Sequence, residues 1–230
     1  MEEKNRIVLP SGGYRNLIAF KKSEVIYQAT VFFCKTFLPP FGDRTVDQMI
    51  QAARSCKQNI AEGSSASGTS KETEIKLTNV ARASLDELLE DYIDFLKAHK
   101  KEEWTIDDIR KIKARKFSSE NNDWDNWRPI IESRPAETIC NLMIIAIQQT
   151  KYLLTKMINK QEEDFRKFGG IRERMHQART AYRAKDWETS IYSTLASSSS
   201  ANDLAVRAQE IRNMIDSMVS SIKHKKGWHK

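Results

Sequence analysis

The sequence predicts an all-α protein: an antiparallel up-down four-helix bundle with a long insertion and a helical C-terminal extension. Gly and Pro are scarce, eight and five in 230 residues, so helix-breaking residues are confined to a few places. Over long stretches, apolar residues recur three or four positions apart, which is the spacing of a buried helix face. No stretch alternates apolar and polar residues as a half-buried strand does. These three observations together predict long helices with few breaks.

The first two predicted helices lie on either side of a proline pair. The first runs from Tyr14 to about Leu38, and Pro39-Pro40 ends it because proline cannot continue a helix. The second opens at Thr45, which forms a capping box with Gln48. We expect it to end at Gly63, where a left-handed residue would close the helix.

The other two bundle helices are separated by the insertion. Ser64–Gly68 is predicted to be a turn, and Thr69 with Glu72 forms a second capping box that opens the third helix. Residues 97–132 break the apolar pattern and are interpreted as an insertion, with a helix near 105–116. Pro135 lies in the first turn of the fourth helix, which is expected to end at about Phe168.

The predicted organisation has three parts. Residues 1–13 form a flexible leader, residues 14–168 form the bundle and residues 169–230 form a basic helical suffix. Within the suffix, a helix begins after two glycines, residues 196–202 resemble a linker, and a last helix covers about 203–222.

Basic charge is concentrated in this suffix. The chain carries a net charge of +7, and residues 169–230 hold eleven Lys/Arg against six Asp/Glu. Such an excess favours nucleic acid, an anionic surface or an acidic partner, although a basic helix face can equally serve only solvation. The short basic run 110–116 is open to the same two interpretations. The candidate phosphate contacts are Lys21, Lys22, Arg54, Lys57 and Arg82 on the bundle, with Arg172, Arg179 and Arg183 on the suffix.

Several kinds of chemistry find little support. Gly63–Ser70 has the outline of a phosphate-binding loop, but Thr69 stands at the lysine position and the segment follows a helix rather than a strand. A di-iron bundle needs two Glu-x-x-His pairs, and Glu173 with His176 is the single match. The three cysteines, which are far from any histidine in sequence, are typical of small buried hydrophobes in a reducing compartment. We therefore expect a non-enzymatic protein without cofactor or metal.

The location follows from what the sequence lacks. No run of about 18 apolar residues could span a membrane, and no basic-then-apolar start resembles a secretory signal. A cytoplasmic protein without membrane contact is the expectation.

Five short strings of the sequence carry a resemblance to a known family. They are Tyr14-x-x-Leu17, Gln51-Ala52-Ala53-Arg54, Asn59-Ile60-Ala61-Glu62-Gly63, Ser70-Lys71-Glu72 and Ala83-Ser84-Leu85-Asp86-Glu87-Leu88. These strings resemble those of the bacterial four-helix bundles encoded in intervening sequences of 23S ribosomal RNA genes, a family to which the accessory variability determinant of diversity-generating retroelements is related. The resemblance covers about residues 14–96 well and 135–168 by pattern, and residues 169–230 look like the C-terminal suffix of some members.

This resemblance implies two hypotheses. Members of the family assemble as ring-shaped homo-oligomers, often pentamers, and the retroelement members bind nucleic acid and partner a reverse transcriptase. The first hypothesis is accordingly a non-enzymatic accessory protein that binds RNA or DNA. The alternative is a homo-oligomeric interaction scaffold that binds no nucleic acid. In both, Asn59, Glu62 and Gly63 form a structural motif, in which Glu62 is expected to bond the free N–H groups opening the third helix or a nearby cation.

Overall fold

The computed structural model describes residues 7–8, 10–39, 44–196 and 201–226. Within these ranges the chain is helical and contains no strand, which confirms the predicted all-α class. The chain divides into two compact units, Met1–Arg172 and Glu173–Lys230, and each is described by itself. Nowhere in the described ranges is a helix both long and apolar enough to cross a membrane.

The first unit contains a short 3₁₀ turn and six α-helices in the described part of the chain. The helices begin and end close to the sequence expectations, with two short helices in the region interpreted as an insertion. Their bounds are η2 Tyr14–Asn16, α1 Ile18–Phe37, α2 Arg44–Ala66, α3 Lys71–Ala98, α4 Ile109–Glu120, α5 Trp124–Ser133 and α6 Ala136–Phe168.

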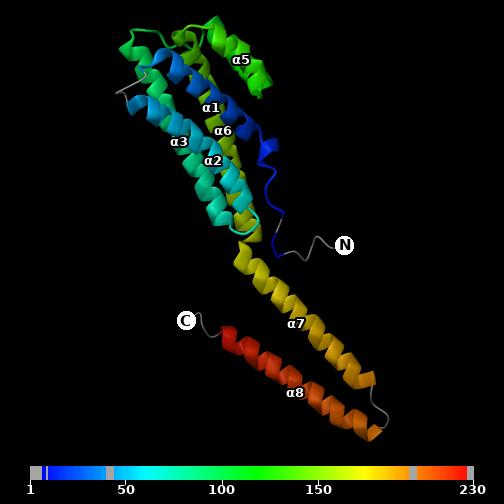
Figure 1. The fold of residues 1–230 in the computed structure, drawn as a ribbon. Coiled ribbons are helices and arrows are strands. Elements are labelled where there is room, and N and C mark those ends of the chain that lie inside the picture. Colours follow the sequence, from blue (N-terminus) through cyan, green and yellow to red (C-terminus); the bar gives the residue numbers. More distant parts are fainter. Residues whose placement is uncertain (1–6, 9, 40–43, 197–200, 227–230) are drawn as a thin grey trace. The chain divides into compact units, whose positions relative to one another are not determined.

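The four longest helices of this unit, α1, α2, α3 and α6, pack side by side so that each contacts two of the others (Figure 1). We call this set of four helices the cycle. α1 contacts α2 and α6, and α3 contacts the same two helices. α4 packs against α6, and α5 packs against α1. Both short helices therefore lie on the outside of the cycle, on its α1 and α6 side.

The core of this cycle is formed by buried apolar side chains from all four helices. Phe33 of α1 meets Tyr92 of α3 at 5.2 Å between ring centroids in an edge-to-face arrangement, which favours aromatic pairs. The Tyr92 hydroxyl is buried, and it lies 2.9 Å from the Thr30 hydroxyl. A buried polar atom without such a partner would cost about 1–3 kcal/mol.

The region 97–132 is anchored to the cycle by polar contacts as well as apolar ones. Trp127 and Ile131 of α5 are buried. The buried amide of Asn141 on α6 accepts a hydrogen bond from the Trp104 backbone N–H at 2.7 Å and donates one to the Glu102 carbonyl at 3.0 Å. The insertion is therefore a packed part of the unit.

The end of α2 differs from the sequence prediction. Gly63 does not close the helix, because α2 continues to Ala66 and Gly63 has no positive φ. A Cβ at Gly63 would lie 3.4 Å from the Glu74 carbonyl oxygen and 3.4 Å from the Leu77 Cβ. The glycine thus allows α2 and α3 to approach closely, and the predicted left-handed cap is wrong.

The start of α3 also differs by one residue. Ser70 rather than Thr69 caps the helix, accepting a hydrogen bond from the Thr73 N–H at 3.1 Å. The Glu62 side chain, expected to bond this helix start or a nearby cation, is exposed and makes no hydrogen bond or ion pair with any residue that the structure describes. The Ser70 hydroxyl fills that role instead.

The predicted leader lies partly outside the described residues. In the described part, the Gly12 N–H donates to the Ser64 carbonyl at 3.2 Å, and the Ser64 hydroxyl donates to the Gly12 carbonyl at 3.2 Å. These two bonds tie residue 12 to the last turn of α2.

The second unit contains α7, Ile171–Ala196, from Glu173 onward, and α8, Ala201–Lys226. No side chain whose burial is described in this unit is buried. The core of the predicted linker, 197–200, lies outside the described residues.

Candidate nucleic-acid interface

Three of the predicted phosphate contacts lie on one face of α7. Gly169, with φ +66°, ends α6 and lets a new helix start at Ile171. Arg172, Arg179 and Arg183 follow at spacings of seven and four residues, so their side chains lie along one line of the helix. All three are exposed, and none forms an ion pair within the described part of the chain. Their guanidinium groups are therefore free to meet an anion.

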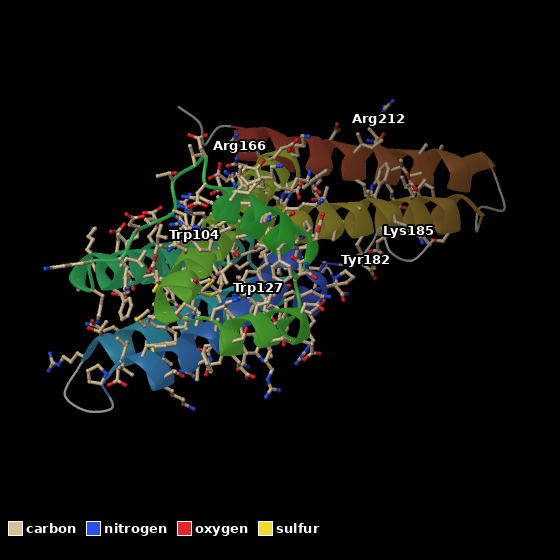
Figure 2. The ribbon with its side chains drawn as sticks, turned by 90° about the horizontal axis from the view of Figure 1, so that it is seen from above. Trp104, Trp127, Arg166, Tyr182, Lys185 and Arg212 are labelled. Carbon is tan, nitrogen blue, oxygen red and sulfur yellow. The ribbon has the colours of Figure 1, made fainter. Side chains whose placement is uncertain are left out.

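Apolar and aromatic side chains lie beside this arginine line. Tyr182 is 73% exposed and Met175 is 51% exposed, and the two are one heptad apart on the neighbouring line of α7. Figure 2 shows Tyr182 projecting away from the helix, and Lys185 adds a further exposed positive charge on α7. An exposed tyrosine ring beside cations is suited to stacking on an unpaired base.

The sequence pattern alone missed the part of Tyr182 and Lys185 in this surface. Ile171, Met175, Ala178 and Tyr182 form an apolar stripe, which by itself predicts burial. This stripe has fewer large apolar side chains than a helix that faces a core usually has. The small number of large side chains is the sequence signal that could have indicated an exposed tyrosine.

Four other candidates, Lys21, Arg54, Lys57 and Arg82, lie in the first unit and are at least partly exposed. They lie on three helices, and three have other partners. The Lys21 ammonium is 3.5 Å from the Asp123 carboxylate, the Lys57 ammonium lies 4.6 Å from the Tyr27 ring centroid, and Arg82 donates to the Asn79 side chain at 2.8 Å. Arg54 is exposed on α2. Three of these four residues are therefore already engaged by other side chains of the first unit.

Lys22 differs from the expectation of a phosphate contact. Its side chain is only 5% exposed, and its ammonium donates to the Ser118 carbonyl and lies 3.3 Å from both the Ser118 hydroxyl and the Gln149 side-chain oxygen. Burial lowers the pKa of Lys22 from 10.5 to about 8. Lys22 faces the interior and links α1 to α4 and α6, so it cannot reach a phosphate on the surface.

The basic run on α4 is divided between two roles. Arg110 is engaged by Asp108 at 2.7 Å, and the Lys111 ammonium donates to the Trp104 carbonyl at 2.7 Å. Lys113, Arg115 and Lys116 are exposed. The first two residues bind groups in the segment just before α4, and the other three face solvent.

The motif residues Asn59 and Gly63 have structural roles. Asn59 donates to the Ser55 carbonyl at 2.9 Å and to the Ser55 hydroxyl at 3.1 Å. The Ser55 hydroxyl lies 2.9 Å from that of Ser84 on α3. Asn59 therefore orients a hydroxyl pair that joins α2 to α3, next to the close approach at Gly63.

A cavity of about 620 Å³ opens between α2 and α3. Its lining carries three carboxyl groups and no basic side chain, a composition that disfavours phosphate. Burial, then the charges of Asp94 and Glu87, raise the pKa of Asp91. This side of the first unit is therefore unsuited to nucleic acid. The lining residues are Asp47, Gln48, Gln51, Ala52, Ser55, Ser84, Glu87 and Asp91.

The described residues form neither a reactive thiol site nor a metal site. Cys34, Cys56 and Cys140 are buried and form no disulfide, and burial raises the pKa of both Cys56 and Cys140. A thiol held protonated in this way is a poor nucleophile. Within the described ranges no three His, Cys, Asp or Glu side chains gather as a metal site.

Compared with known proteins, the chain matches no family model, no curated protein and no solved structure. The resemblance carried by the short strings of α2 and α3 accordingly stays a prediction.

Proposed function

We propose that this protein is a non-enzymatic accessory protein that binds RNA or DNA through α7. The observation that carries the proposal is the line formed by Arg172, Arg179 and Arg183, exposed and without ion pairs to described residues. Tyr182 beside it offers a stacking surface. Guanidinium groups meet phosphate oxygens in paired hydrogen bonds, and this arrangement reads no base edge. Binding without strong sequence preference follows.

The resemblance of the Asn59–Gly63 string supports two finer parts of this proposal. The first is the architecture: we take α1, α2, α3 and α6 to be an up-down four-helix bundle to which α4 and α5 are added. The second is the partner, a reverse transcriptase that uses the bound nucleic acid. A homo-oligomeric scaffold is the alternative hypothesis, and the two hypotheses differ in whether α7 binds nucleic acid.

Fluorescence anisotropy with a labelled 30-nucleotide RNA and a 30-base-pair DNA duplex tests the proposal. Removing one arginine–phosphate pair reduces the slope of log affinity against log salt by about 0.7 for a single strand and about 0.9 for a duplex. The triple variant Arg172→Gln, Arg179→Gln, Arg183→Gln should therefore lower the slope by roughly two to three and weaken binding at least tenfold at low salt.

A matched control removes the same charge elsewhere. Lys97, Arg128 and Lys160 are exposed and paired with carboxylates of their own helices, so changing all three to Gln should leave the affinity within about twofold, since such surface pairs contribute little. Equal losses of affinity in both triple variants would show that only net charge matters. A native protein that binds neither probe at 50 mM salt would refute the proposal.

A further inference from the structure

The outer face of α4 has no role in nucleic-acid binding through α7. Ile109 and Ile112 of α4 are 61% and 50% exposed, and Ile106, just before the helix, is 70% exposed. The opposite face of α4 is fixed on the first unit, because Ala114 and Ser118 are buried. Three large aliphatic side chains are therefore in water beside a helix that is already folded and held in place.

Cations surround these isoleucines. The helix Ile109–Glu120 carries five Lys/Arg and one Glu, which gives it a charge of +4. Asp108 pairs with Arg110, and a Glu103 carboxylate oxygen lies 3.4 Å from the Lys111 ammonium. The other three cations are exposed and form no ion pair in the part of the chain that the structure describes. They are Lys113, Arg115 and Lys116.

The isoleucines and two of these lysines lie on the same side of the helix. Ile109 is followed by Ile112, Lys113 and Lys116 at three, four and seven residues, which is the spacing of one helix face. Glu120 lies at the end of this face and is its single acidic member within α4. We give the name α4 face to Ile106, Ile109, Ile112, Lys113 and Lys116.

From this pattern we infer that the α4 face docks on the surface of an anionic lipid bilayer. The isoleucine side chains enter the boundary between head groups and acyl chains. Each lysine keeps its ammonium among the head groups while its aliphatic stem lies along the apolar layer. Arg115 at the edge of the face meets further anionic head groups. A nucleic-acid backbone would meet the cations but leave the isoleucines in water.

A bilayer suits this face better than an acidic protein does. The side chains stand on the outward, convex side of α4, so a flat surface reaches all of them at once, whereas a protein partner needs a groove that receives the helix. Lysine is also depleted in protein–protein interfaces, but it is favoured on helices that lie at a membrane surface. Because α4 is folded before contact, docking carries no cost for ordering the helix.

The sequence led us to expect a protein without membrane contact. That expectation rested on the lack of a spanning run, and a helix that lies on a bilayer surface does not need such a run. Since the face offers a few isoleucines and cations and no inserted chain, the attachment is reversible and depends on anionic lipid.

Vesicle sedimentation with the nucleic-acid-free full chain tests this docking. The probes are vesicles of phosphatidylcholine alone and vesicles that also contain about 30% phosphatidylserine, an anionic lipid. The native chain should bind the anionic vesicles at least tenfold more tightly than the neutral ones. This binding should weaken as the salt concentration rises, because salt screens the attraction between lysine and lipid.

Two double variants distinguish the α4 face from other basic surfaces of the chain. Ile109→Ser with Ile112→Ser keeps every charge, and it should weaken binding to the anionic vesicles at least tenfold because the apolar contact is lost. Lys113→Gln with Lys116→Gln keeps the isoleucines, and it should weaken binding by a similar factor at low salt. Circular dichroism confirms that each variant is folded.

Matched controls make the same changes elsewhere in the first unit. Ile18 and Val80 are exposed, and Lys97 and Lys160 are exposed lysines paired with carboxylates of their own helices. The variants Ile18→Ser with Val80→Ser, and Lys97→Gln with Lys160→Gln, should bind the anionic vesicles within about twofold of the native chain.

A fluorescent label at position 109 reports lipid contact directly. Ile109→Cys can be labelled selectively with an environment-sensitive dye, since the three native cysteines are buried. Its emission should shift to shorter wavelength on anionic vesicles, and a label at Glu90→Cys, an exposed position of α3, should not shift.

Three results would overturn the inference. They are a native chain that binds neither kind of vesicle at 50 mM salt, an isoleucine variant that binds like the native chain, and a label at position 109 whose emission stays unchanged in vesicle-bound protein. An amphipathic helical peptide of leucine and glutamate is the competing probe. Binding of that peptide by the α4 face without binding of vesicles would assign the face to an acidic protein and also overturn the inference.

The outcome is separable from that of the proposed function. The isoleucine variant retains every arginine of α7, so its RNA affinity should stay within about twofold of the native value while its vesicle binding falls. A native chain that binds RNA but no vesicle would refute the docking alone. One that binds vesicles through the α4 face but no nucleic acid would refute the proposed function alone.

Discussion

At the scale of single residues, Gly63 lies where two helices approach closely. It lies inside α2, and the neighbouring atoms of α3 are 3.4 Å from where its Cβ would be, which is ordinary van der Waals contact. A methyl group therefore fits at this position without moving the backbone, whereas a branched side chain does not.

We predict that Gly63→Ala leaves the protein as stable or up to about 1 kcal/mol more stable, because alanine is the better helix former. Gly63→Val should destabilise it by about 1–3 kcal/mol through overpacking against α3. Urea unfolding followed by circular dichroism measures both. Destabilisation by alanine would instead show that the atoms of α3 at 3.4 Å leave no room for a methyl group.

Gly169 is the matched control for backbone conformation. Its φ of +66° is costly for a residue with a Cβ, so Gly169→Ala should lower the free energy of unfolding by about 1 kcal/mol. The two alanine substitutions are thus expected to have opposite signs.

Lys22 makes stability depend on pH in a defined window. Its pKa is about 8 in the folded protein against an ordinary 10.5. Between these values the unfolded chain holds a proton that the folded chain has released, so stability rises with pH. Below about pH 8 both states are charged and burial of the ammonium is an undiminished cost.

The substitution Lys22→Met should remove this dependence while keeping the length of the side chain. We expect the difference in unfolding free energy, native minus variant, to rise from pH 7.5 to pH 10. Urea titrations at four pH values measure it, and the subtraction cancels the titration of other groups. A difference that stays constant with pH would contradict the assignment.

At the scale of elements, Asn141 holds the chain between α3 and α4 against α6. Replacing it with Leu leaves the Trp104 N–H and the Glu102 carbonyl without their partner. We predict a loss of about 2–4 kcal/mol, since each unsatisfied group costs about 1–3 kcal/mol. Limited proteolysis should show earlier cleavage near residues 100–108, and unchanged cleavage kinetics would argue against this role.

The sequence predicted the long helices well because their apolar spacing is local information. α3 and α6 begin and end within a few residues of the expected positions. The packing of 97–132 could not be predicted, because its anchors are the distant partners Lys22, Asn141 and Gln149. The burial of Lys22 could not be predicted for the same reason, because its partners are distant in sequence and the local pattern indicates an exposed charge.

The candidate interface was predictable in part. The arginine line on α7 follows from helical spacing alone, and the structure leaves those side chains exposed. The exposure of Tyr182 depends on what packs against α7, which the spacing does not encode. Gly63 is similar, because its role is set by the backbone of α3.

At the scale of the whole molecule, the division into two units has a direct test. The first unit holds the buried core, whereas in the second unit no side chain whose exposure is described is buried. A fragment of residues 1–172 should therefore unfold cooperatively with a Tm within a few degrees of the full chain, as measured by differential scanning calorimetry. It should also lose nucleic-acid affinity, since Arg179, Arg183 and Tyr182 are removed. A fragment without a cooperative transition would show that the core needs residues beyond 172.

The three buried cysteines allow local opening of the fold to be measured from the rate at which each thiol is alkylated. They lie on α1, α2 and α6, so each samples a different helix of the cycle. Since a buried thiol reacts with an alkylating reagent only after its surroundings open, mass spectrometry of labelled peptides over time would give an opening rate for each helix. Equal rates would mean that the cycle opens as one cooperative body, and a faster rate at one thiol would identify the helix that leaves first.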